Sequence, residues 1–182
     1  GAESEIDLSD KQFSKIGNSA FNGNTAINSV ILPSGVTVID ANAFYGCANL
    51  IYINLENVVT VNENAFYNCA ALGSLAAGDA SKKIDLSKVT SFGNGAFFGC
   101  AALSEANLSA AVSIGDLAFA KTGLTEVTFG ANLETIGACA FANADKVPTS
   151  GKPVKSGTNV QLSAVNIPAS VKSIGMGAFA WV

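Results

Sequence analysis

The chain of 182 residues contains no histidine and no arginine, so all ten of its basic residues are lysines. Histidine is the most frequent general base in enzymes, and arginine is the side chain best suited to bidentate contacts with phosphate groups. The net charge of -4 also provides no basic surface of the kind that nucleic-acid binding requires. We therefore expect neither an enzyme nor a nucleic-acid-binding protein.

Long hydrophobic runs are missing too, because no apolar stretch approaches the roughly 20 residues that are needed to cross a bilayer. Charged residues make up only 13% of the chain, which is too little for a disordered protein, while the hydrophobic content of 49% is ample for a core. We expect one folded unit over residues 1–182, without membrane insertion and with any signal peptide already removed.

One nine-residue stretch occurs in three similar copies: NAFYGCANL at 42–50, NAFYNCAAL at 64–72 and GAFFGCAAL at 95–103. Each contains an Ala-Phe pair that recurs along the chain. We call its phenylalanines the anchor residues; they are Phe21, Phe44, Phe66, Phe97, Phe119, Phe141 and Phe179. The intervals of 23, 22, 31, 22, 22 and 38 residues predict about seven coils of a repeat protein. The two longer intervals predict insertions near 73–83 and 143–160.

The residues at fixed distances from the anchors show which positions are constrained. The positions eight and five residues before each anchor are always apolar, as at Val36 and Ile39. The position four residues before is Gly, Asn or Asp, and the position two residues after is Gly or Asn in the first four coils. Since these residue types tolerate a positive φ, we predict left-handed turn residues at both positions, with one helical turn between them.

A short segment of alternating apolar and polar residues precedes each turn. These segments are 30–32, 53–55, 84–86, 106–108, 127–129 and 165–167, and EIDLS at 5–9 matches KIDLS at 83–87. Period-2 alternation predicts strands with one face inward. A single coil cannot bury its inward residues, so neighbouring coils must stack and place phenylalanine on phenylalanine along a continuous core.

The four cysteines have three possible roles. Cys47, Cys69 and Cys100 stand three residues after the anchor in successive coils, and Cys139 stands two residues before its anchor. Close pairs such as C-x-x-C, which zinc sites normally use, are missing. We expect buried free thiols, the usual state of an unpaired cysteine; one strained disulfide between coils and a metal site are the alternatives.

The segments VILPSGVTVIDANAFYGCANL at 30–50 and AVNIPASVKSIGMGAFA at 164–180 resemble the BspA-like leucine-rich repeat family. The resemblance implies an α/β solenoid, a right-handed coil with one parallel β-sheet face and short helical turns opposite it. It also implies a secreted or cell-surface interaction scaffold of bacterial or protist type, often assigned to adhesion.

The expected strands present a row of side chains outward on the sheet face, the surface that solenoids commonly use for partners. The candidate binding residues are Ser29, Ile31, Tyr52, Asn54, Asp85, Glu105, Asn107, Glu126, Thr128 and Asn166. Ile31 and Tyr52 form the most apolar part, and aromatic residues are enriched at binding hot spots. Isolated exposed apolar residues are equally ordinary on any surface.

Glu105 and Glu126 are expected on adjacent strands, about 5 Å apart by the spacing of a sheet. Such a pair is either a solvated strand face or a weak cation site, and we predict no metal or other cofactor. The sequence favours a bacterial adhesion module that binds a host or bacterial surface protein or glycan through the sheet face. The alternative is a structural spacer within a larger surface protein, with no ligand of its own.

Overall fold

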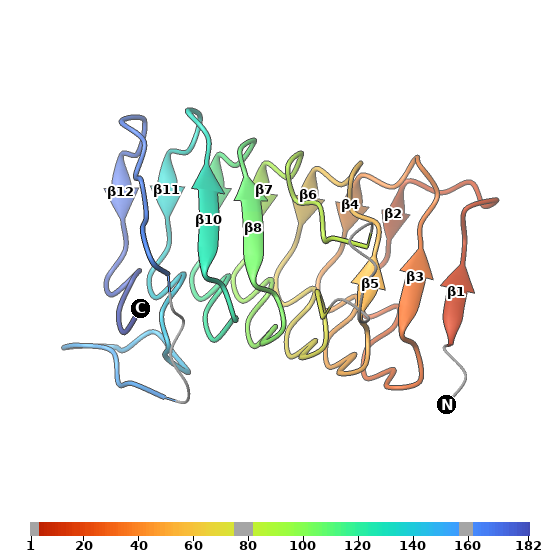
Figure 1. Ribbon diagram of the computed structural model, residues 1–182, viewed down its shortest axis with the longest axis horizontal. Coiled ribbons are helices and arrows are strands. Elements are labelled where there is room, and N and C mark those ends of the chain that lie inside the picture. The colour runs from red at the N-terminus through yellow and green to blue at the C-terminus, as the bar shows by residue number, and fades with distance from the viewer. Residues whose placement is uncertain (1–3, 75–81, 157–161) are drawn as a thin grey trace.

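The computed structural model describes residues 4–74, 82–156 and 162–182. They form a stack of coils with the two termini at opposite ends (Figure 1). The described residues contain twelve strands and no helix. The expectation of short helical turns is therefore wrong: stretches such as 41–46, between the two predicted turn positions, form non-helical turns. The parallel solenoid itself is confirmed.

One side of the stack, which we call the front face, carries two parallel sheets (Figure 1). The first joins β1 (Glu5–Asp7), β3 (Ser29–Ile31) and β5 (Tyr52–Ile53), and the second joins β8 (Glu105–Leu108) and β10 (Glu126–Phe129). Segments 84–86 and 165–167 are not strands, contrary to expectation. Each lies within one of the two long intervals between anchors, after the predicted insertion.

The opposite side carries a second, unpredicted sheet, the rear sheet, with seven parallel strands. In pairing order these are β12 (Ser173–Ile174), β11 (Thr135–Ile136), β9 (Ser113–Ile114), β7 (Ser91–Phe92), β6 (Thr60–Val61), β4 (Val38–Ile39) and β2 (Lys15–Ile16). The second residue of each is the apolar residue five positions before an anchor, which is buried in every strand but β12. Strands of two residues are too short to show an alternating pattern, so period-2 alternation could not predict this sheet.

The anchors stack as predicted. Successive ring centroids are 5.0–5.4 Å apart, and the planes of successive rings differ by 1–17°. The backbone follows the same ladder, because the N–H of Phe44 donates to the carbonyl of Ala65 in the next coil at 2.8 Å. The N–H of Phe97 donates to Ala118 in the same way, at 2.7 Å. Each coil is thus tied to the next by both ring stacking and hydrogen bonding.

The left-handed turn residues are confirmed two positions after the anchor, at Gly23, Gly46, Asn68 and Gly99. The prediction is wrong for the position four residues before the anchor, where no residue has a positive φ. Glycine is used there for space: a Cβ on Gly137 would lie 2.4 Å from the backbone carbon of Gly115 in the preceding coil. The second left-handed position lies two residues before the anchor, at Ser19, Asn42, Asn64, Gly95, Leu117, Cys139 and Gly177.

All four cysteines are free and buried, as expected. The thiols of Cys47, Cys69 and Cys100 donate to the carbonyl of the anchor in the preceding coil, at 3.0–3.2 Å. Burial raises the pKa of the Cys100 thiol. In the next coil Thr122 takes the same position and donates to the carbonyl of its own anchor at 2.8 Å. The cysteines therefore serve as small buried donors in the core.

Candidate functional site

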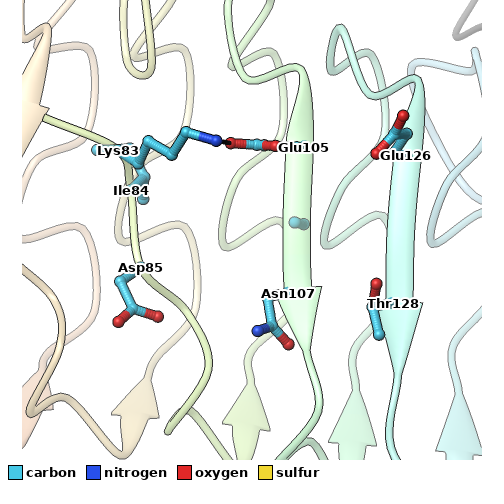
Figure 2. Close-up of a pocket in the computed structure, with 8 residues that line it drawn as sticks. Lys83, Ile84, Asp85, Glu105, Asn107, Glu126 and Thr128 are labelled. Carbon is cyan, nitrogen blue, oxygen red and sulfur yellow. Dashed lines mark ion pairs between the residues drawn. The ribbon is translucent and has the colours of Figure 1, made fainter. Parts of the chain in front are cut away.

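The front face is hollowed where segment 83–86 faces β8 (Figure 2). The hollow has a volume of 470 Å³ and is open to solvent. Its lining residues are Lys83, Ile84, Asp85, Glu105, Ala106, Asn107, Glu126 and Thr128. Five of the ten predicted binding residues are brought together here, from three successive coils.

The regular pairing of β8 with β10 sets the geometry of the right side of Figure 2. The strands are parallel and in register, so that Glu126 lies beside Glu105 and Thr128 lies beside Asn107. Along β8, Ala106 points into the core and its two neighbours point outward, as the alternation predicts. The sequence therefore predicted the facing of these four side chains correctly.

A single ion pair spans the hollow. The Nζ of Lys83 lies 2.7 Å from an Oε of Glu105, and Figure 2 shows the lysine reaching across from its own segment to β8. Both side chains are about half exposed, at 56% and 50%, so the pair contributes no more than about 1 kcal/mol. Lys83 was not among the candidates, although it occupies the same repeat position as Glu105 and Glu126.

Two of the polar side chains in the hollow also accept a hydrogen bond from the backbone two residues later. An Oδ of Asp85 accepts the N–H of Ser87 at 2.9 Å, and the Oδ of Asn107 accepts the N–H of Ser109 at 3.1 Å. This Asx turn is a local side-chain alternative to a ladder bond. It gives the recurring Asp/Asn-Leu-Ser sequence a structural role beside any binding role.

Glu126 and Thr128 have no such role. Their side chains are exposed and form neither an ion pair nor a hydrogen bond with any part of the chain that the structure describes. Their polar atoms are the ones in the hollow that are most available to a ligand.

The remaining candidates do not join this surface. Ser29 is only 7% exposed, so the prediction that it is accessible on the face is wrong: it lies in the middle strand of its sheet, between Glu5 and Tyr52. Tyr52 is half-buried, with the Nζ of Lys82 at 5.9 Å from its ring. Ile31 is also half-buried.

Asn54 and Asn166 differ from the expectation in other ways. The Oδ1 of Asn54 accepts the N–H of Leu32 at 2.6 Å, and its Nδ2 donates to the carbonyl of Leu32 at 3.2 Å. The side chain thus extends the ladder between two coils and is engaged by the solenoid. Asn166 is exposed but lies outside any strand.

A second aromatic ladder was missed in the sequence. Tyr45, Tyr67 and Phe98 directly follow their anchors and stack with centroid distances of 4.9 and 4.5 Å. The Nζ of Lys121 lies 5.9 Å from the ring of Phe98 and pairs with Asp145 at 2.6 Å. Because their ring faces cover one another, these residues tie coils together. The signal was present in the aromatic residue that ends each AFY or AFF.

Residues 4–74, 82–156 and 162–182 hold no group of three or more acidic, cysteine or histidine side chains suited to a metal ion. The same ranges contain no helix with the length and apolar character of a membrane span.

A family model for the BspA type leucine-rich repeat region matches residues 14–148 in six copies. The chain belongs to this family. Among solved structures, the BspA-type chain is similar to a leucine-rich repeat protein of T. pallidum, with 25% identity and a TM-score of 0.50. That match covers 78% of this chain and 74% of the other.

Two more solved structures share lower identity with this BspA-type chain. A leucine-rich repeat protein from Bacteroides ovatus ATCC 8483 is 19% identical, with a TM-score of 0.41; the match covers 94% of this chain and 53% of that protein. A leucine-rich cell surface protein from Faecalibacterium prausnitzii A2-165 is 22% identical, with a TM-score of 0.49 and coverages of 98% and 67%. The chain thus spans about half the length of the B. ovatus protein. No curated protein matches the sequence.

Proposed function

We propose that this chain is a binding module of a secreted or surface-displayed bacterial protein, and that it recognises a host or bacterial surface protein or glycan through the front face. The observation that carries the proposal is the hollow, where the outward side chains of three coils converge. Solenoids commonly bind partners on such extended faces. The family resemblance to surface scaffolds agrees with this setting.

The chemistry of the hollow supports a polar ligand. Two carboxylates, an amide and a hydroxyl lie on β8 and β10 within one small area, and Ile84 and Ala106 form an apolar floor. A binding site typically combines such an apolar base with a few placed polar groups. Glu126 and Thr128 have free polar atoms that a ligand would satisfy.

The structural spacer is the second candidate, and one observation favours it. Asp85, Asn107 and Asn54, three of the predicted binding residues, bond to the backbone of the solenoid itself. These bonds stabilise the solenoid itself, and a structural spacer needs no ligand contacts from the same side chains. The spacer reading then predicts that Glu126 and Thr128 can be changed without any loss of association.

The two functions are separated by a pair of matched substitutions. Thr128→Lys places a charge in the hollow, and Thr135→Lys places the same charge at an exposed position of the rear sheet. The purified protein and both variants are tested against immobilised matrix proteins and an array of surface glycans. A ligand that is kept by Thr135→Lys and lost by Thr128→Lys supports the binding module. Retention by both variants, or no ligand for the parent, supports the spacer.

A further inference from the structure

The front face has a gap in its hydrogen-bonded ladder at the hollow. Strand β8 pairs with β10 on one side, but no backbone hydrogen bond joins its other side to the described residues of segment 83–86. On the rear of the same two coils, β7 and β9 pair normally. In Figure 2, β8 lies between segment 83–86 and β10, and the space on the side of segment 83–86 is the wider one. These two coils therefore touch at the rear and are parted at the front.

The gap lies at the segment that directly follows the insertion in the sequence. The anchor interval across it is 31 residues, whereas 22 is the usual value. After the insertion, Ile84 and Leu86 still bury their side chains in the core, so the segment stays in place. Its backbone nevertheless remains outside the ladder. Within the part of the chain that the structure describes, this edge of β8 faces the hollow and pairs with no neighbouring strand.

An unpaired strand edge is a template for another extended chain, because each backbone N–H and C=O needs a partner. Addition of a peptide strand to such an edge is an established mode of recognition between proteins. Strand β8 runs for four residues, Glu105–Leu108, which is about 13 Å at the usual rise per residue, and Glu105 and Asn107 direct their N–H and C=O groups to the free edge. This length suits a short peptide segment.

The charges around the gap select the kind of peptide. Three carboxylates line the hollow, on Asp85, Glu105 and Glu126, against the single lysine Lys83. That lysine is already paired with Glu105. An incoming strand would place alternate side chains outward between Asp85 and Glu105, with Glu126 one strand farther away, while the others would face Ile84 and Ala106. Opposite charges on neighbouring strands stabilise the pairing.

We propose that the free edge of β8 binds an extended cationic segment of a partner protein, added as a strand with lysine or arginine at every second position and small apolar residues between them. This inference rests on the proposed function, whose site it shares, and narrows the ligand to a basic peptide. Lys83 competes with the ligand for Glu105 and so limits its affinity.

The test uses a labelled peptide of three Lys-Val repeats, titrated into the full chain by fluorescence anisotropy. Two further peptides separate the contributions: one with N-methylated backbone amides, which cannot donate ladder bonds, and one with glutamate in place of lysine. We expect only the unmodified Lys-Val peptide to bind. Binding should also slow amide exchange of Glu105 and Asn107, whose N–H groups point away from β10.

Protein variants locate the site. Glu126→Gln and Asp85→Asn remove charge alone, since the amide of the latter still accepts the N–H of Ser87. Each should weaken the Lys-Val peptide by about two- to fivefold, and Lys83→Ala should tighten it by a similar factor. Glu63→Gln, at an exposed rear position, is the matched control and should leave affinity unchanged. Thermal melts confirm that each variant is folded.

Some results would overturn the proposal. If the N-methylated peptide binds as well as the parent peptide, the contact is ionic and no strand is added. If the Lys-Val peptide does not bind, while a surface glycan or protein is lost by Thr128→Lys, this inference fails and the proposed function stands. If neither the peptide nor any surface ligand binds, both fail.

Discussion

At the scale of single residues, five of the anchors are the largest fully buried side chains of the described core. Phe97 is fully buried between Phe66 and Phe119, with centroid distances of 5.0 and 5.3 Å. Phe97→Ala should lower the free energy of unfolding by about 3–5 kcal/mol, because it opens a cavity and removes two stacking contacts. Urea unfolding measures this. Val112→Ala, at a residue that is 39% exposed, is the control and should cost about 0.5 kcal/mol or less. Equal midpoints for the two variants would contradict the stacked core.

The glycines four positions before the anchors provide a second test at this scale. A Cβ on Gly137 would lie 2.4 Å from the backbone of Gly115, whereas a Cβ on Gly17 would meet nothing within 4 Å. Gly137→Ala should therefore destabilise the protein by about 1–3 kcal/mol through overpacking. Gly17→Ala should be neutral or stabilise it by up to about 1 kcal/mol, because it restricts the unfolded chain. Thermal unfolding of the two variants decides, and a similar loss in both would show that close packing is not the cause.

The glycines also show what residue types can and cannot predict. The identity of Gly137 indicates a special position but not its kind, since a positive φ and a close backbone approach both favour glycine. Asn42, Asn64 and Gly95 recur two positions before the anchor, and these residue types did mark the left-handed position that was not predicted. Leu117 and Cys139 adopt the same φ without any such signal, because the neighbouring coils impose it.

At the scale of elements, the alternation of apolar residues predicted the front strands but not the rear ones. Alternation needs several residues to be visible, as in Glu126–Phe129, and a strand of two residues cannot show it. The outward facing of Glu105 and Glu126 could be predicted, because it depends only on period 2. The gap beside β8 could not, because residues 84–86 show the same alternation as the segments that do form paired strands.

The side chain of Asn54 replaces backbone hydrogen bonds between two coils. Asn54→Ala removes the acceptor of the Leu32 N–H and the donor to the Leu32 carbonyl. The loss of both bonds should cost about 1–3 kcal/mol, since a half-buried backbone group is left without its partner. Hydrogen exchange at the Leu32 amide should become faster in the variant. Asn132→Ala, at an exposed turn position, is the control; unchanged exchange at Leu32 in the Asn54 variant would contradict the role.

At the scale of the whole molecule, the absence of histidine controls the response to pH, because the charges that change lie at the acid end. Asp40 accepts the backbone N–H of Ala41 and a hydrogen bond from Asn62, and these hold the pKa of its carboxyl below the ordinary 3.8. The hydroxyl and backbone N–H of Ser9 lower the pKa of Asp7 in the same way. Both carboxylates join residues at turns of the stack.

The carboxyl of Asp145 also has a lowered pKa, because it accepts a hydrogen bond from Lys121. A carboxyl whose pKa is lower in the folded state stabilises the fold above its ordinary pKa, and this contribution is lost as the pH falls through the folded value. The melting temperature should therefore be flat between about pH 5 and 7, where no side chain titrates at its ordinary pKa, and should fall below about pH 4. Calorimetric scans from acid to neutral pH measure this. The combined Asp7→Asn, Asp40→Asn and Asp145→Asn variant keeps the acceptors but not the charges, so its decline in acid should be shallower; a decline as steep as that of the parent would show that other groups govern acid stability.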